Sequence, residues 1–572
     1  MSAFMKPDKN YLPSFATSLS QLSFFGVMLG ILLLLTGLSF KGIASPKKEF
    51  RASSALTGIP DVTNPNTKLI IVTNFAVANG SSTNSVEAHI VDVLGNPVTN
   101  QQVVFTINGA TGGVGANTDA NGYAVITLTS TIAGVANITA KVLGLPIVFG
   151  SPAQVVFVPD VPDPVASTLT VVTTGAIANG TATNSVKAHI TDDNGNVIAN
   201  TTVTFAIVSG TGTFIGSTTL TTDANGDAVI TLTSTVVGSV GITASINGTN
   251  ITGSPASVQF VAGPPDVTVS TTALSVVTTG ATANGTSTNS VNAHITDASG
   301  NVVANASVTF AIASGTATFV GSTTVTTDAS GNATITLTST VAGNVGITAT
   351  VGGNNITNGS PATVQFVADV PSTTSPTTAL SVVTTGATAN GTATNSVKAH
   401  ITDANGNAVA NASVVFAIAS GTGTFVGSTT VTTDASGNAT ITLTSTVAGN
   451  VGITATVNGS NITNGSPATV QFVAGAPSTS SPTTTLSVVT TGATANGTAT
   501  NSVKAHLTDA NGNVVANATV TFAIASGTGT FVGSTTVTTD VNGNATITLT
   551  SIVAGNVGIT ATVGGNNITN GS

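Results

Sequence analysis

Short runs of alternating apolar and polar residues fill most of this chain, and turns rich in Gly, Asn and Asp separate them. A period of two predicts strands with one buried face. The polar positions are mostly Thr, which suits a half-exposed strand. About seven such strands in about 90 residues predict a two-sheet sandwich. Within residues 397–472, five successive predicted strands each have one apolar face. The residues on these faces are Val397, Ala399 and Ile401, then Val414, Phe416 and Ile418, then Ala439, Ile441 and Leu443, then Ile453, Ala455 and Val457, and finally Val470 and Phe472.

This pattern repeats five times. Residues 380–465 and 486–571 differ at nine of 86 positions, which indicates tandem duplication. The predicted modules span residues 69–158, 169–261, 274–367, 380–473 and 486–572. Proline-containing linkers such as "ADVPSTTSPTT" separate them. Because proline fixes φ and favours extended backbone, we expect semi-rigid spacers and modules strung out in a line.

The last module differs from the others at its end. Each earlier module closes with a stretch like "GSPATVQFVA", whereas the fifth stops at Ser572, before the corresponding proline. A sandwich without its closing strand exposes an edge and an apolar slot. We therefore expect this sequence to be a fragment of a longer protein.

The first 68 residues do not share the repeat. Leu22 to Phe40 is an uncharged run of 19 residues, long enough to cross a bilayer as a helix. Gly42 and Ala44 fit the small residues of a signal-peptidase site before Ser45, while Lys41, Lys47, Lys48 and Arg51 also suit a retained anchor. We predict a signal peptide or membrane anchor over residues 1–45, then a linker over residues 46–68.

Charge and composition limit the classes of partner and the kinds of chemistry that this chain can have. Charged residues make up 5% of the chain, and the net charge is −9. From Leu169 onward three lysines face twelve aspartates, which argues against binding to nucleic acid. The chain has no cysteine, so disulfides, thiolate catalysis and zinc-cysteine sites are excluded.

The candidate chemistry lies in the stretch "NSVKAHITDANGN" at residues 395–407. Each module places one histidine here, at His89, His189, His294, His400 and His506. Alternation puts these side chains on the outer face of the sheet, where we expect them to be largely exposed. Each has too few potential co-ligands for a metal site. We expect them to be structural, with a role in module contacts or in pH response left open.

The turn "DANGN" at residues 403–407 begins like a calcium loop, but it lacks the sixth-position glycine and the twelfth-position acid. An Asx turn is the favoured interpretation. Calcium bridging between modules through linker residues such as Asp266 or Asp369 stays open as an alternative. We predict no catalytic, cofactor-binding or metal-binding residue, because no local group of acids, bases or nucleophiles interrupts the repeat.

Two stretches carry a resemblance to a known family. "DANGNAVANASVVFAIASGTGTF" at residues 403–425 and "TTDASGNATITLTSTVAGNVGITATV" at residues 432–457 resemble the bacterial Ig-like module of group 1, and matches recur in all five units. That module builds the stalks of the intimin and invasin family. The resemblance implies an all-β, Ig-like array and an exported surface stalk or adhesin.

The predicted function is thus a structural one. We expect a non-enzymatic stalk or adhesin region at the cell surface, in the outer membrane or outside the cell. Its predicted partners are an unidentified surface protein or glycan, possible copies of itself, and a membrane if the N-terminal helix is retained. A secreted matrix or biofilm protein, and the accessory repeats of a larger surface enzyme, are the alternatives.

Overall fold

A computed structural model describes residues 58–571, and every regular element in that range is a β-strand. No helix among these residues is long and apolar enough to cross a membrane. The predicted N-terminal helix at Leu22 to Phe40 lies outside them. The chain divides into two compact units, one ending at Val158 and one beginning at Pro159. The first holds module 1 and the second holds modules 2 to 5.

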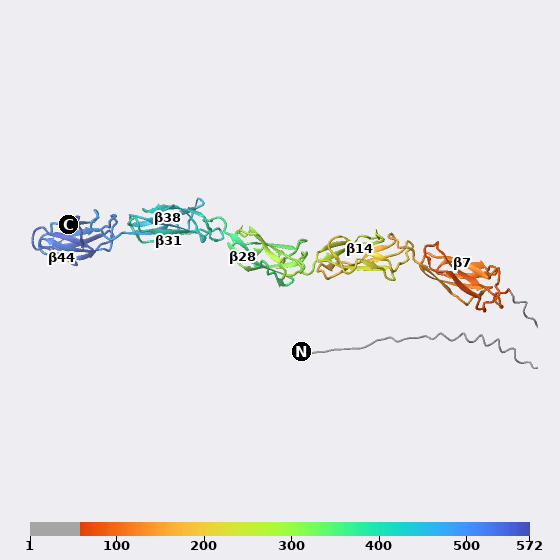
Figure 1. Cartoon of the computed structure of the whole chain (residues 1–572). Helices are drawn as coiled ribbons and strands as arrows, with labels where there is room; N and C mark the ends of the chain where they lie inside the picture. The colour runs from red at the N-terminus through yellow and green to blue at the C-terminus, as the bar shows by residue number, and fades with distance from the viewer. Residues whose placement is uncertain (1–57, 572) are drawn as a thin grey trace, which may run out of the picture. The chain divides into compact units, whose positions relative to one another are not determined.

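The strands repeat in the same order from module to module, and Figure 1 draws each module as a separate group of strands. Module 1 comprises β1 (Lys68–Thr73), β2 (Ala76–Val77), β3 (Asn84–His89), β4 (Gln102–Asn108), β5 (Thr111–Gly112), β6 (Gly115–Asn117), β7 (Tyr123–Thr129), β8 (Gly134–Val142), β9 (Leu145–Pro146) and β10 (Ala153–Val158). Module 2 comprises β11 (Thr168–Thr173), β12 (Ala176–Ile177), β13 (Asn184–His189), β14 (Thr202–Ser209), β15 (Thr213–Phe214), β16 (Thr219–Thr221), β17 (Asp227–Thr233), β18 (Gly238–Ile246), β19 (Thr249–Asn250) and β20 (Ala256–Val261).

The strands of the next two modules lie at corresponding positions. Module 3 comprises β21 (Ala273–Thr278), β22 (Ala281–Thr282), β23 (Thr288–His294), β24 (Ser307–Ser314), β25 (Thr318–Phe319), β26 (Thr324–Thr326), β27 (Asn332–Thr338), β28 (Gly343–Val351), β29 (Asn354–Asn355) and β30 (Ala362–Val367). Module 4 comprises β31 (Ala379–Thr384), β32 (Ala387–Thr388), β33 (Asn395–His400), β34 (Ser413–Ser420), β35 (Thr424–Val426), β36 (Thr430–Thr432), β37 (Asn438–Thr444), β38 (Gly449–Val457), β39 (Ser460–Asn461) and β40 (Ala468–Val473).

Module 5 has fewer strands among the described residues. It comprises β41 (Thr485–Thr490), β42 (Asn501–His506), β43 (Thr519–Ser526), β44 (Thr530–Val532), β45 (Thr536–Thr538), β46 (Asn544–Thr550), β47 (Gly558–Val563) and β48 (Asn566–Asn567). Up to Gly571, where the described range ends, it has no counterpart of the closing strand β40 or of the short strand β32.

Each complete module packs two sheets face to face. In module 4 one sheet has the order β31-β33-β37-β35, and the other has the order β32-β40-β38-β34-β36 with β39 beside β38. The closing strand β40 is antiparallel to β38 and parallel to β32. This arrangement confirms the predicted all-β sandwich. Modules 1 to 4 have ten strands each rather than about seven, because strands of two or three residues are too short to show a period.

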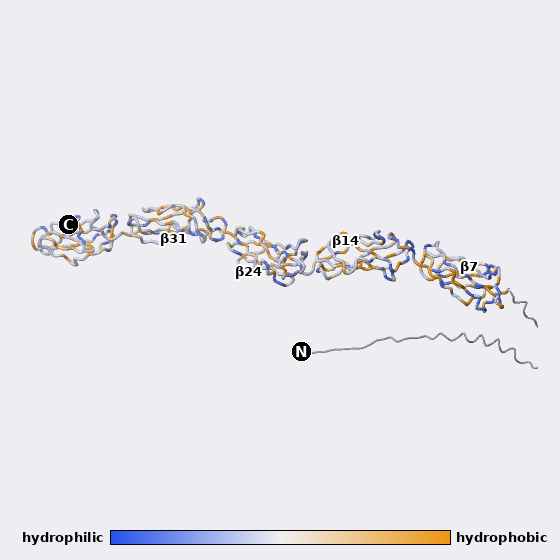
Figure 2. The backbone as a smooth tube through the Cα atoms, in the orientation of Figure 1, coloured by the Kyte–Doolittle hydropathy of each residue, from blue (hydrophilic) through white to orange (hydrophobic). Residues whose placement is uncertain are grey.

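The core of each module lies between its two sheets. In module 4, Val397, Phe416, Ile453 and Phe472 come from four strands and are almost completely buried. Full burial of such a side chain contributes roughly 1.5–3 kcal/mol. Apolar positions are spread through all five modules in Figure 2, as expected where every module has its own core.

A buried asparagine also joins the two sheets. Asn395 is fully buried at the start of β33. Its Oδ1 accepts a hydrogen bond from Ala387 N on β32 at 3.1 Å, and its Nδ2 donates to Gln471 O on β40 at 2.8 Å. Asn84, Asn184 and Asn289 make the same two contacts in modules 1 to 3. Position 395 therefore fixes β32 and β40 against the first sheet.

Candidate functional site: the aspartate turn and the module junction

The turn at residues 403–407 is built on a buried carboxylate. Asp403 follows β33, and its Oδ1 accepts from Asn405 N at 2.8 Å and from Asn407 N at 2.9 Å. These bonds confirm the predicted Asx turn. Its Oδ2 accepts from Asn407 Nδ2 at 2.8 Å and from Asp369 N, in the preceding linker, at 3.0 Å. One side chain thus shapes the turn and fastens the linker.

The same arrangement of hydrogen bonds recurs at the equivalent aspartate of other modules, and it favours the charged form of the aspartate side chain. Burial raises the pKa of Asp403, but the hydrogen bonds from Asn407, Asp369 and Asn405 outweigh that effect, so the pKa lies below its ordinary value. The pKa values of Asp192, Asp297 and Asp509 are lowered for the same reasons. Their linker donors are Asp160 N, Gly263 N and Gly475 N. The linkers are thus bonded to the modules that follow them.

The asparagines of the turn reach the preceding module. Between modules 3 and 4, Asn405 Nδ2 donates to Ala283 O at 3.0 Å, and Asn407 Nδ2 donates to Thr340 O at 3.0 Å. Asn407 Oδ1 accepts from Ala342 N at 2.8 Å. Each of these three bonds joins an amide side chain to the backbone of the neighbouring module. We call this set the junction clamp.

The junction between modules 4 and 5 has the same clamp. Asn511 Nδ2 donates to Ala389 O at 2.9 Å, Asn513 Nδ2 donates to Thr446 O at 3.0 Å, and Asn513 Oδ1 accepts from Ala448 N at 2.7 Å. These residues follow Asn405 and Asn407 by one repeat. The clamp is therefore a property of the repeated sequence.

The junction between modules 2 and 3 uses a variant. Ser299 stands where the later modules have asparagine, and a serine lacks the reach of an amide. Here Asn301 Nδ2 donates to Ala178 O at 3.1 Å, and Asn301 Oδ1 accepts from Val237 N at 3.2 Å. One asparagine thus makes both contacts, with one intermodule bond fewer than in the two later junctions.

The five histidines lie on the outer face of the sheet, but they are half-buried rather than largely exposed. The register of β33 and β37 places His400 opposite Asn438, and His400 Nδ1 lies 3.0 Å from Asn438 Oδ1. The expectation of high exposure was wrong because the side chain of the adjacent strand covers the ring. His294 and His506 contact Asn332 and Asn544 in the same way, at 2.9 Å each.

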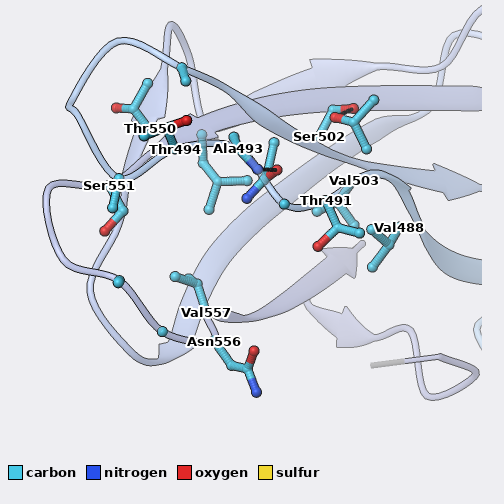
Figure 3. A pocket seen from close by; sticks show the side chains of 18 of the residues that line it. Val488, Thr491, Ala493, Thr494, Ser502, Val503, Thr550, Ser551, Asn556 and Val557 are labelled. Atoms are coloured by element: carbon cyan, nitrogen blue, oxygen red, sulfur yellow. Dashed lines mark hydrogen bonds between the residues drawn. The ribbon is translucent and has the colours of Figure 1, made fainter.

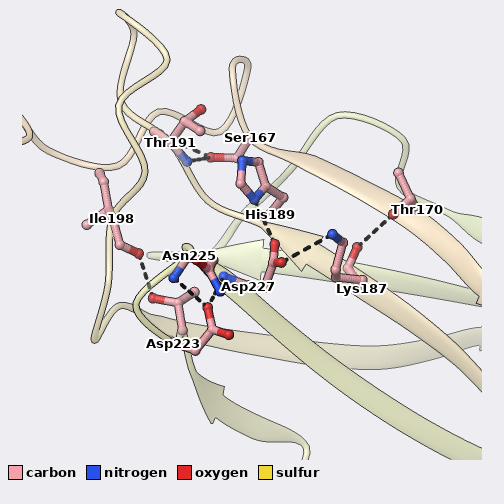
Figure 4. Close-up of polar contacts among 10 residues, drawn as sticks. Ser167, Thr170, Lys187, His189, Thr191, Ile198, Asp223, Asn225 and Asp227 are labelled. Carbon is pink, nitrogen blue, oxygen red and sulfur yellow. Dashed lines mark hydrogen bonds and ion pairs between the residues drawn. The ribbon is translucent and has the colours of Figure 1, made fainter. Parts of the chain in front are cut away.

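Modules 1 and 2 differ at the residue opposite the histidine. His89 stacks on Tyr123, with ring centroids 4.4 Å apart. In module 2, Asp227 accepts from both His189 Nδ1 at 2.7 Å and Lys187 Nζ at 3.2 Å (Figure 4). These contacts are local and partly exposed, and they need no ligand to complete them.

Potential cation ligands stay dispersed in residues 58–571, where no three His, Cys, Asp or Glu side chains gather. Asp266 Oδ1 accepts from the backbone and hydroxyl of Thr268, and Asp369 Oδ1 accepts from Val370 N. The two linker aspartates are therefore engaged in local turns of their own.

The junction clamp was not predicted from the sequence, although the motif that carries it, residues 403–407, was recognised as a turn. An Asx turn needs the aspartate carboxylate and the backbone amides of the following residues. It does not need amide side chains at both Asn405 and Asn407. Both amides recur one repeat later, as Asn511 and Asn513. This recurrence is the sequence signal from which a role for the two side chains beyond the turn could have been inferred.

The comparisons with known proteins point to one kind of module. The family model described as bacterial Ig-like domain (group 1) matches residues 66–158, 166–261, 271–367, 377–473 and 483–572. A relative, the inverse autotransporter adhesin YeeJ of Escherichia coli (strain K12), is 29% identical over 296 residues. That match covers 48% of this chain and only 12% of the length of YeeJ.

Solved structures of similar chains include invasin, a bacterial integrin-binding protein, and InvD of Yersinia pseudotuberculosis. Invasin is 22% identical with a TM-score of 0.38, covering 71% of this chain and 78% of invasin. InvD is 22% identical with a TM-score of 0.39, covering 52% of this chain and 96% of InvD. The family assignment depends on the five domain matches, which span most of the sequence. The chain belongs to the bacterial Ig-like domain (group 1) family.

Proposed function

We propose that this chain is the stalk region of an exported adhesin and that its modules present an adhesive surface away from the cell. The observation that carries the proposal is the repeated junction clamp, in which each module from the third onward is hydrogen-bonded to the one before it. Such bonds limit bending between modules. A repeat array gains length by copying a folding unit, and length with limited bending is what a stalk requires.

The similarity to the adhesin YeeJ supports this proposal. The partner class we propose is a protein or glycan on another cell, contacted weakly by several modules, so that avidity multiplies the individual affinities. Contacts between copies of the chain are a further possible mode. The proposed location is the cell surface, with a membrane contact through residues 22–40 if that segment is retained.

We propose no enzymatic role. The polar clusters of residues 58–571 are copies of one another or local ion pairs, and potential metal ligands do not gather there. A catalytic centre requires a group of acids, bases or nucleophiles that converge on one point. The repeated clusters instead connect strands, turns and linkers.

The proposal is tested by surface labelling and attachment in the source organism. An antibody raised against module 4 should label intact cells, and deletion of the gene should reduce attachment to host or neighbouring cells. Detection of the protein only in the culture medium would instead support the alternative function, a secreted matrix or biofilm protein. Unchanged attachment with altered biofilm texture would support the same alternative.

An in-frame deletion of residues 380–485 provides a matched control. It removes one whole repeat and joins module 3 to a module that carries the same clamp residues, Asn511 and Asn513. If the repeats supply length, this variant should be displayed at the normal level while attachment falls by less than in the full deletion. Normal attachment with fewer repeats would argue that reach is not their role.

A further inference from the structure

The two sheets of modules 2 to 5 differ in the charge that their strands carry. Within residues 159–571, the strands of the second sheet, which in module 2 comprises β12, β20, β18, β14, β16 and β19, contain no Lys, Arg, Asp or Glu. The charged strand residues all belong to the first sheet, and they are Lys187, Asp227, Lys398 and Lys504. The other aspartates of these modules lie in turns and linkers. One outer face of each module is therefore free of charged strand residues.

Hydroxyl and amide side chains form a row across this face. In module 3 the strand register places Thr324, Thr309, Thr350 and Asn355 side by side on β26, β24, β28 and β29. The corresponding rows are Thr219, Thr204, Ser245 and Asn250 in module 2, Thr430, Val415, Thr456 and Asn461 in module 4, and Thr536, Thr521, Thr562 and Asn567 in module 5. We call the outer face of the second sheet, marked by this row in modules 2 to 5, the uncharged face.

Strand alternation directs these polar side chains away from the core. In module 5, Val557 packs against the core, and Figure 3 shows its side chain pointing toward the space between the sheets. The side chain of the preceding Asn556 points the other way. Asn344 has the same place in module 3, where it lies opposite Gln365 on β30. The uncharged face therefore continues with amides beyond the row of hydroxyls.

The groups on this face bond to groups of their own kind. Thr309 Oγ1 and Thr324 Oγ1 are hydrogen-bonded at 3.1 Å, and Ser239 Oγ donates to Gln259 Oε1 at 2.6 Å. A hydroxyl both donates and accepts, and an amide side chain has a group of each kind. An interface between two identical surfaces must be complementary to itself. Hydroxyls and amides meet that condition, whereas two ammonium groups or two carboxylates repel each other.

The charges of the chain favour the same face. From Leu169 onward twelve aspartates stand against three lysines, so two copies that meet through their turns or linkers bring like charges together. The uncharged face avoids this repulsion. Module 1 differs, because Lys141 lies opposite Val104 where modules 3 and 4 have Thr350 and Thr456. The self-complementary face is thus a property of modules 2 to 5.

We propose that the uncharged faces of modules 2 to 5 dock on the same faces of a second copy of this chain. The hydroxyl and amide rows of the two copies exchange hydrogen bonds, and the threonine methyl groups and valines between them supply apolar contact. The inference rests on the proposed function, because surface display brings copies of the chain together at high local concentration. It names the surface through which displayed chains contact one another.

The area of the face explains why several modules are needed. β28 has nine residues, so with strands about 4.8 Å apart and a rise of about 3.4 Å per residue the face of module 3 offers on the order of 600 Å². A stable interface takes about 800 Å² from each partner. One pair of modules is therefore a weak contact, and contacts at several modules raise the avidity without any new kind of bond.

The test compares two triple variants of the full chain, kept soluble in a mild non-ionic detergent. One carries Thr204→Glu, Thr309→Glu and Val415→Glu on the uncharged face, and the other carries Val229→Glu, Thr334→Glu and Thr440→Glu on the first sheet. Each set replaces two threonines and one valine, all exposed strand residues, so the added charge is the same.

Sedimentation should show concentration-dependent association of the unsubstituted chain. The first variant should associate at least about ten-fold more weakly, because it places like charges opposite each other. The second variant should associate like the unsubstituted chain. Added salt should leave the association of the unsubstituted chain unchanged, since no ion pair is screened. Hydrogen exchange of the cores checks that both variants are folded.

Cysteine cross-linking gives a second measurement that does not depend on destabilising substitutions. The chain has no cysteine, so a single Thr309→Cys provides one reactive thiol on the uncharged face. Treatment of cells that display this variant with a short bis-maleimide should give covalent dimers. The matched control is Thr334→Cys on the first sheet of the same module, and its dimer yield should be several-fold lower.

Four outcomes would overturn the proposal: a chain that stays monomeric, equal weakening in the two triple variants, equal cross-linking at both cysteines, or association that salt abolishes. A monomeric chain that binds dextran, an uncharged polysaccharide, would assign the face to a glycan instead. The stalk proposal fails separately. A self-associating chain whose deletion leaves attachment unchanged would contradict the adhesin, and a monomeric chain whose deletion reduces attachment would contradict only the docking of copies.

Discussion

Asn407 of module 4 and Ala342 of module 3 are hydrogen-bonded across the module boundary, with Ala342 N donating to Asn407 Oδ1 at 2.8 Å. The same asparagine is held from its own side, where its Nδ2 donates to Asp403 Oδ2. A turn within one module therefore fixes the position of a group that binds the module before it.

Asn405→Ala should loosen the junction between modules 3 and 4 without unfolding either module. The side chain makes one intermodule bond, to Ala283 O, while its backbone amide still supports the turn. The loss is on the order of 1 kcal/mol of junction free energy. Distances between spin labels on the two modules should broaden. Asn542→Ala removes an exposed amide side chain from a turn of module 5, outside the junction between modules 3 and 4. Equal broadening between modules 3 and 4 in that variant would contradict the clamp.

Asp403→Asn should destabilise module 4 by about 2 kcal/mol or more. The carboxylate accepts four hydrogen bonds, and an amide would turn a donor toward Asn407 Nδ2 or Asp369 N. Hydrogen exchange of the module 4 core measures the change in unfolding free energy. The matched control is Asp434→Asn in an exposed turn, where Oδ1 accepts two backbone bonds. We expect the Asp434→Asn variant to lower the unfolding free energy of module 4 by less than about 1 kcal/mol.

Acid should weaken the modules through these same aspartates. Burial raises the pKa of Asp192, Asp297, Asp403 and Asp509, but hydrogen bonds outweigh it and hold each pKa below the ordinary value of 3.8. The unfolded chain is protonated first, so the stabilisation is present above about pH 4 and is lost as the pH falls through the folded-state pKa. Urea midpoints between pH 7 and pH 2 should follow this course. A module 4 that carries Asp403→Asn should show a shallower decline, and an unchanged decline would assign acid sensitivity to other groups.

Asp227→Asn should convert module 2 to the arrangement of modules 3 to 5. It removes the ion pair with Lys187 and leaves an amide oxygen for His189, as Asn438 provides for His400. The pair is partly exposed, so the loss should stay under about 1 kcal/mol. Its salt dependence is the specific readout, because screening weakens an ion pair. The unfolding midpoint of module 2 should change with salt concentration in the unsubstituted protein. In the Asp227→Asn variant the same midpoint should not change with salt concentration.

Much of the fold was predictable because each strand carries its own signal. The alternation of Val397, Ala399 and Ile401 with Lys398 and His400 is enough to assign one buried face. The Asx turn at Asp403 was likewise local, since donor and acceptor lie within five residues. The two-residue strands such as β32 were not predictable, because their only evidence is pairing with β40, about 85 residues further along the chain.

The amino-acid sequence by itself determined the repeat, the sandwich and the turn chemistry, because these depend on neighbours within one strand or one turn. Only the tertiary structure decided what the repeated amides do. Asn405 and Asn407 bind backbone groups more than sixty residues away, and Asn395 joins β32 to β40 through one amide side chain. Both roles depend on which backbone groups lie within hydrogen-bonding distance of an amide side chain in the folded chain. A local sequence pattern does not encode the distance between groups that are so far apart in the sequence.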